Sequence, residues 1–147
     1  LREIMRAEGI ETTIPNMTEF GNNLRNNKGY AFLAERATGQ IKESEDVLIT
    51  SIRQVGEIKF LKKRSDFTLV KLDAPIEMRL ERLIKRKREG DIRNMEELKE
   101  IEARQADGKD GGMNMNKCYE LATETIINDG AFAELYHKVD RLVDRLR

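Results

Sequence analysis

Three short apolar runs alternate with helical patterns along this chain, and this alternation limits the fold more than any other feature. Residues 47–50, 67–72 and 125–128 are rich in β-branched and other apolar side chains. The first run has no polar alternation, which is typical of a strand buried on both faces. Strands that alternate with helices predict an α/β protein, with a parallel sheet of about three strands flanked by helices.

The helical segments can be placed from apolar spacing and from cap residues. The first is expected to end at Gly9, the second to begin at Asn16 or Thr18, and the fourth to have Ser51 as its N-cap. Pro75 suits the first turn of the helix that follows the second strand. The predicted helices cover residues 1–8, 16–26, 30–37, 54–63, 75–88, 96–104, 115–122 and 132–146.

The composition narrows the possible partners. Lys plus Arg and Asp plus Glu both number 27, so the formal net charge is zero and no overall attraction to nucleic acid or anionic membrane follows. Cys118 and His137 are the only cysteine and histidine, which excludes an internal disulfide and a His/Cys zinc site within one chain. We expect Cys118 to be packed, His137 to be solvated, and the protein to be cytoplasmic.

An arginine cluster follows the second predicted strand. Its members lie three, four and two residues apart, so most of them share one helical face: Arg79, Arg82, Arg86 and Arg88. Guanidinium groups suit phosphate oxygens, and ligands in open α/β sheets sit beyond the carboxyl ends of strands. The alternative is a solvated helix face with Glu81 and Glu89 as charge partners.

Three further segments carry candidate residues. Arg53 follows the first strand, and Glu57, one turn later, could orient it through a salt bridge. Arg25 ends a segment that starts at Gly21, and by itself it is typical of a surface arginine. The turn from Asn128 to Gly130 follows the third strand and could frame a flat base, although a simple strand-to-helix turn explains it equally well.

Taken in order, these four segments resemble a P-loop nucleotide kinase of the adenylate kinase and dephospho-coenzyme A kinase-like group, especially its nucleoside-monophosphate-kinase-like members. The resemblance implies ATP as the phosphoryl donor and Mg²⁺ as cofactor. It implies that Arg25 and Arg53, supported by Glu57, bind the acceptor phosphate. It also implies that Arg86 and Arg88, with Arg104 as a further candidate, reach the transferring phosphates.

The same resemblance implies an adenine site and a domain plan. Arg82 would lie against the adenine, and Asn128 and Gly130 would line its pocket. The chain would be a single kinase domain, with an acceptor-binding cap at residues 18–38 and a lid at 87–112. Its partners would be small-molecule nucleotides rather than nucleic acid or membrane, and the acceptor would be a (deoxy)nucleoside monophosphate or, second, dephospho-coenzyme A.

One departure from the family pattern shapes these expectations. The chain has no Gly-x-x-x-x-Gly-Lys-Ser/Thr motif, and Thr50 stands where many relatives have an acid that helps to hold magnesium. Because it starts with Leu1 in a helical pattern, we expect an N-terminal truncation, an inactive fragment, and a gap or an irregular re-pairing of the sheet between the strands at residues 47–50 and 67–72. The rival hypothesis is a non-catalytic nucleotide-binding module that has lost its phosphate loop.

Overall fold

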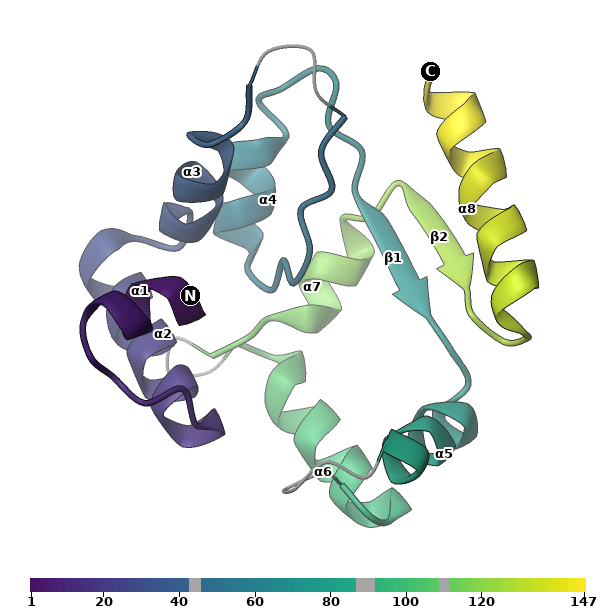
Figure 1. Ribbon diagram of the computed structural model, residues 1–147, viewed down its shortest axis with the longest axis horizontal. Helices are drawn as coiled ribbons and strands as arrows, with labels where there is room; N and C mark the ends of the chain where they lie inside the picture. The colour runs from purple at the N-terminus through teal and green to yellow at the C-terminus, as the bar shows by residue number, and fades with distance from the viewer. Residues whose placement is uncertain (43–45, 87–91, 109–111) are drawn as a thin grey trace. The chain divides into compact units, whose positions relative to one another are not determined.

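The computed structural model describes residues 1–42, 46–86, 92–108 and 112–147 and has a mixed α/β fold (Figure 1). The chain divides into two units. The first, here called the helical unit, contains residues 1–67 and 104–121, and the second, the sheet unit, contains residues 68–103 and 122–147. The predicted single domain, with its cap and lid, stays a prediction.

Short helices build the helical unit, each packed against its neighbour in the sequence of pairs α1–α2, α2–α3, α3–α4 and α4–α7. Met5, Ile58 and Leu61 are its fully buried large side chains, and Ala34 and Cys118 are also buried. The helices are α1 (Arg2–Ala7), α2 (Ile14–Lys28), α3 (Phe32–Thr38), α4 (Val55–Leu61) and α7 (Met115–Glu120).

Helix α1 ends as predicted at Gly9, which has a positive φ of 71°. The Gly9 N–H donates to the Arg6 carbonyl at 3.1 Å and the Ile10 N–H donates to the Met5 carbonyl at 2.8 Å. This pair of bonds is the Schellman motif, in which glycine takes the left-handed position without the clash of a Cβ.

The predicted start of the second helix is wrong. Thr13, rather than Asn16 or Thr18, is the N-cap of α2, because its hydroxyl accepts from the Asn16 N–H at 3.4 Å. Pro15 therefore lies inside the first turn, where its missing N–H is no loss. The helix ends at Gly29, whose φ is 95°.

In the sheet unit, β1 (Val70–Asp73) and β2 (Glu124–Ile127) pair in parallel, with Val70 opposite Glu124 and Asp73 opposite Ile127. Figure 1 shows the two arrows running side by side, with α8 (Phe132–Leu146) along β2. Ile126 and Leu142 are buried there, and His137 is exposed as predicted. The unit also contains α5 (Ile76–Arg86) and most of α6 (Met95–Ala106).

The predicted strand at residues 47–50 is wrong. This segment has no strand structure, Leu48 is 86% exposed, and the sheet of the described residues has two strands rather than about three. A strand is stable only when its N–H and C=O groups find a neighbouring strand, and an apolar run alone does not supply one.

The predicted cap at Ser51 is also wrong. Ser51 has a left-handed φ of 65°, and α4 instead begins after Gln54, with a capping box closed by Glu57. Among the described residues, no helix combines the length and the apolar character needed to cross a lipid bilayer.

Candidate functional site

Glu57 is the centre of a charged cluster in the helical unit. It lies in the first turn of α4 with 8% of its surface exposed, and its Oε2 accepts from the backbone N–H groups of Arg53 at 2.9 Å and Gln54 at 3.0 Å. Burial raises the pKa of this carboxyl, while those two hydrogen bonds and the charges of Arg25 and Arg53 lower it. The carboxylate thus both caps a helix and faces two cations.

Arg25 reaches this cluster from the last turn of α2. Its pKa is lowered, chiefly by burial, and the charge of Arg53 acts in the same direction while that of Glu57 opposes it. The Nη2 group donates to Asn22 Oδ1, and a Cβ at Gly21 would lie 3.3 Å from Arg25 Nη1. Glycine at position 21 therefore leaves room for this guanidinium over its own helix.

Arg53 belongs to the cluster in a different way from the one predicted. The proposed salt bridge from its guanidinium to Glu57 is wrong, because the carboxylate binds the peptide N–H of Arg53 instead. The exposed guanidinium has Nη1 2.9 Å from the Met113 sulfur, and the Arg53 carbonyl accepts from the Asn114 N–H at 3.0 Å. These contacts tie the segment before α4 to the segment before α7.

Sequence reasoning missed two neighbours of this cluster, Tyr30 and Gly56. A Cβ at Gly56 would lie 2.6 Å from the Tyr30 Cβ and 3.0 Å from its carbonyl carbon, so α4 can approach the start of α3 only with glycine there. The signal in the sequence was a glycine one residue inside a helix, which is otherwise unfavourable.

A second cluster lies in the sheet unit, where Arg82 of α5 binds the turn after β2. Its Nη1 donates to the Asn128 carbonyl at 3.0 Å, and its Nη2 donates to Asn128 Oδ1 at 3.2 Å and to the Gly130 carbonyl at 3.5 Å. The three residues that sequence reasoning assigned to the adenine site are therefore brought together.

The remaining arginines of the predicted phosphate arm are placed differently. Arg79 binds the side chains of Asp73 and Glu102. Arg86 is exposed at the last residue of α5, and Arg104 is exposed in α6. Arg88, Asp91 and Glu89 lie outside the described residues, as do 87–91 and 109–111 of the predicted lid. Glu81 pairs with Lys85 at 2.6 Å, an i,i+4 pair of the kind that the alternative of a solvated helix face predicts.

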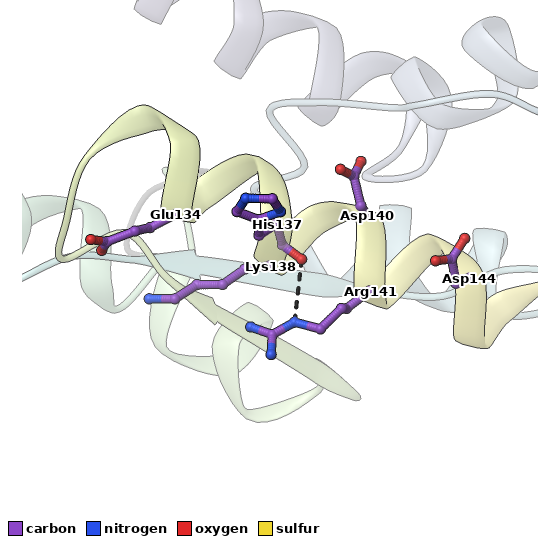
Figure 2. Close-up of a pocket in the computed structure, with 6 residues that line it drawn as sticks. All are labelled: Glu134, His137, Lys138, Asp140, Arg141 and Asp144. Atoms are coloured by element: carbon purple, nitrogen blue, oxygen red, sulfur yellow. Dashed lines mark hydrogen bonds between the residues drawn. The ribbon is translucent and has the colours of Figure 1, made fainter.

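Lys138 is a further residue that sequence reasoning missed. Its Nζ donates to the Ile127 carbonyl at 2.7 Å and to Asp129 Oδ1 at 2.6 Å, so a second cation holds the same turn as Arg82. Figure 2 shows the hollow beside it, lined by six side chains of α8 alone: Glu134, His137, Lys138, Asp140, Arg141 and Asp144. One helix does not enclose a ligand, and this is the polar outer face of α8.

Cys118 is packed, as predicted. Burial, together with the charge of Glu57, raises the pKa of its thiol to about 11. A thiol of this kind is protonated at neutral pH and is a poor nucleophile. Within the described ranges, no group of three or more His, Cys, Asp or Glu side chains could hold a metal ion.

The chain is similar to proteins named UPF0200. It is 30% identical to a UPF0200/UPF0201 protein of Archaeoglobus fulgidus over 99% of this chain and 46% of that protein. It is 29% identical to a UPF0200 protein of Hyperthermus butylicus, covering 99% of this chain and 77% of the relative. A UPF0200 protein of Methanothrix thermoacetophila is 28% identical over 98% of this chain and 81% of its own length.

These relatives carry no activity in their names. The chain spans about half the length of the Archaeoglobus fulgidus relative. No protein-family model and no solved structure matches it. A functional hypothesis must therefore rest on the chemistry of the two clusters.

Proposed function

We propose that this chain is part of an ATP-dependent kinase that transfers a phosphoryl group to a nucleotide-like acceptor. A (deoxy)nucleoside monophosphate is the first acceptor to test, and dephospho-coenzyme A is the second. The observation that carries the proposal is the arrangement around buried Glu57: its carboxylate accepts from the Arg53 N–H at 2.9 Å, and the charges of Arg25 and Arg53, from separate segments of the helical unit, act on it.

The charges of this cluster suit a phosphate group. Two guanidinium groups and one carboxylate leave a net positive charge, and a phosphate monoester carries about −1.5 to −2 at neutral pH. The Glu57 carboxylate is already bound to two peptide N–H groups, so its part is to fix the segment that carries Arg53. Arg25 and Arg53 would bind the acceptor phosphate, and Glu57 would position them.

The second cluster supports a different part of the same function. Arg82 uses Nη1 and Nη2 to bind oxygens of Asn128 and Gly130, so its hydrogen-bonding edge is occupied by protein. The flat face of a guanidinium held in this way suits stacking against an aromatic ring. Arg82, Asn128 and Gly130 would therefore hold the adenine of ATP.

Stabilisation of the transferred phosphoryl group and binding of Mg²⁺ are proposed for the complete protein. ATP supplies the phosphoryl group, and charge on that group in the transition state is stabilised by cations, the role proposed for Arg86 and Arg88. We assign no residue of this chain to Mg²⁺.

Calorimetric binding of AMP, dAMP and dephospho-coenzyme A to this chain tests the acceptor site. Arg25→Ala and Arg53→Ala should each weaken acceptor binding by roughly tenfold or more, because a hydrogen bond to a charged group contributes about 1.5–3 kcal/mol. The matched control is Arg36→Ala, an exposed arginine of α3, which should leave binding unchanged. Unaltered affinity in both test variants would contradict the proposal.

The ATP site and the reaction need the complete coding sequence. In that protein, Arg82→Ala should weaken ATP binding while sparing the acceptor, with Arg141→Ala of α8 as control. Arg86→Ala should lower kcat. If the protein binds nucleotide but transfers no phosphoryl group to any acceptor tested, the non-catalytic module is favoured instead.

A further inference from the structure

Acidic and carbonyl groups surround the guanidinium of Arg79 in α5. Nε and Nη2 donate to the two carboxylate oxygens of Glu102 at 3.0 and 2.9 Å. Nη1 donates to Asp73 Oδ1 at 3.2 Å and also to the Ala74 carbonyl. One side chain of α5 thus links the end of β1 to α6.

The geometry of this link depends on arginine. A planar guanidinium offers parallel N–H groups that match both oxygens of a carboxylate, and a lysine ammonium cannot bind in that way. The side chains of Arg79, Asp73 and Glu102 are 34%, 35% and 38% exposed. The ion pairs are thus partly shielded from water, and their attraction is less screened than that of a fully exposed pair.

Apart from this link, α6 has a buried leucine and a hydrogen-bonded start. Leu98 is its buried residue, and Glu102 lies four positions later on the same face of the helix. The helix start is closed locally, since Asn94 Oδ1 accepts from the Glu97 N–H at 2.9 Å and Glu97 accepts from the Arg93 N–H at 3.0 Å. The ionic contact of Glu102 therefore lies on the same face of α6 as its buried leucine.

We infer that Arg79 is a positioning residue, which fixes α6 to the carboxyl end of β1 through Glu102 and Asp73, and that it is not a phosphate ligand. Its donors toward these groups are already used. The link to function rests on the proposed kinase, in which α6 belongs to the predicted lid region. Arg79 would then fix the position of α6 relative to the end of β1.

Hydrogen exchange of the intact chain, followed by mass spectrometry, tests the inference without any enzyme assay. Arg79→Ala and Glu102→Ala should each speed exchange of the amides in residues 95–103 by roughly tenfold, because a charge-assisted pair is lost. The double variant should exchange no faster than either single one, since both changes break the same contact. Arg79→Lys should restore only part of the protection.

Arg82→Ala is the matched control, because it removes an arginine one turn along the same helix. It should leave α6 unchanged and loosen residues 128–130 instead. High salt gives a second control: about 1 M NaCl should speed α6 exchange in the wild type and have little further effect in Arg79→Ala.

Two results would overturn the inference. One is unchanged α6 exchange in Arg79→Ala, and the other is additive effects in the double variant. If Arg79→Ala unfolds the whole sheet unit, Glu102→Gln, which keeps the shape and removes the charge, must still loosen α6 selectively or the inference fails. Failure of nucleotide binding would overturn the proposed function and leave this result standing.

Discussion

The two arginine clusters of this protein use the same side chain in opposite ways. In the helical unit, a buried carboxylate binds peptide N–H groups and faces two guanidinium groups. In the sheet unit, the Arg82 guanidinium itself donates to carbonyl and amide oxygens of the turn after β2. The comparison shows an acidic side chain organising the backbone in one unit, and an arginine side chain organising it in the other.

Removing the organising carboxylate should have the largest effect. Glu57→Ala leaves the Arg53 and Gln54 N–H groups without their acceptor and removes the capping box, at a cost of about 3 kcal/mol in unfolding free energy. Urea denaturation measures this cost. Glu35→Ala, at an exposed glutamate of α3, should change stability by less than about 0.5 kcal/mol.

The same substitution, Glu57→Ala, tests whether the two clusters are organised independently of each other. Hydrogen exchange of the sheet unit should hardly respond to Glu57→Ala, while residues 53–61 should exchange faster. If residues 128–130 also exchanged faster to the same extent, the contrast between the clusters would be wrong, because the two would not be independently organised.

A smaller effect is expected from Gly56→Ala. The added Cβ would meet backbone atoms of Tyr30 at 3.0 and 3.1 Å, so α3 and α4 must move apart, at a cost of about 2 kcal/mol. Gly39→Ala is the control, because a Cβ there meets nothing closer than 3.5 Å and φ is −63°. Thermal unfolding of both variants would show the difference, and equal melting temperatures would count against the close packing of α3 on α4.

The pH dependence of stability should give the smallest and most specific contrast. The pKa of Glu57 is raised, chiefly by burial, so its contribution to stability increases as pH falls through the folded-state value. The pKa of Asp73 is lowered, first by its hydrogen bond to Lys71, so its contribution is present above the ordinary value and is lost as pH falls.

Urea titrations between about pH 7 and pH 3, with Glu57→Gln and Asp73→Asn as references, would measure how the unfolding free energy contributed by each carboxyl changes with pH. The stability of the wild type relative to Glu57→Gln should rise with acid. Relative to Asp73→Asn it should fall. Slopes of the same sign would show that one of the two carboxyls has a different environment from the one described.

Local structure was largely predictable from the sequence because its causes lie within a few residues. Gly9 and Gly29 mark helix ends, since each takes a positive φ that other residues avoid. The strand near residue 70, the strand near residue 125 and the closing helix were also predicted. The predictions for the strand at residues 47–50, the cap at Ser51 and the start of the second helix failed for related reasons. A strand needs a partner strand, and a cap needs a particular turn of the backbone. Neither is a property of the segment itself.

From the sequence alone, Arg25, Arg53, Arg82, Asn128 and Gly130 could be named as candidate site residues through the resemblance that their order and spacing carry. Only the tertiary structure decided what each of them binds. Arg82 binds Asn128, 46 residues along the chain, and Arg79 binds Glu102, 23 residues along the chain. Hydrogen-bond partners are chosen by distances of about 3 Å in space, which spacing along the chain does not encode.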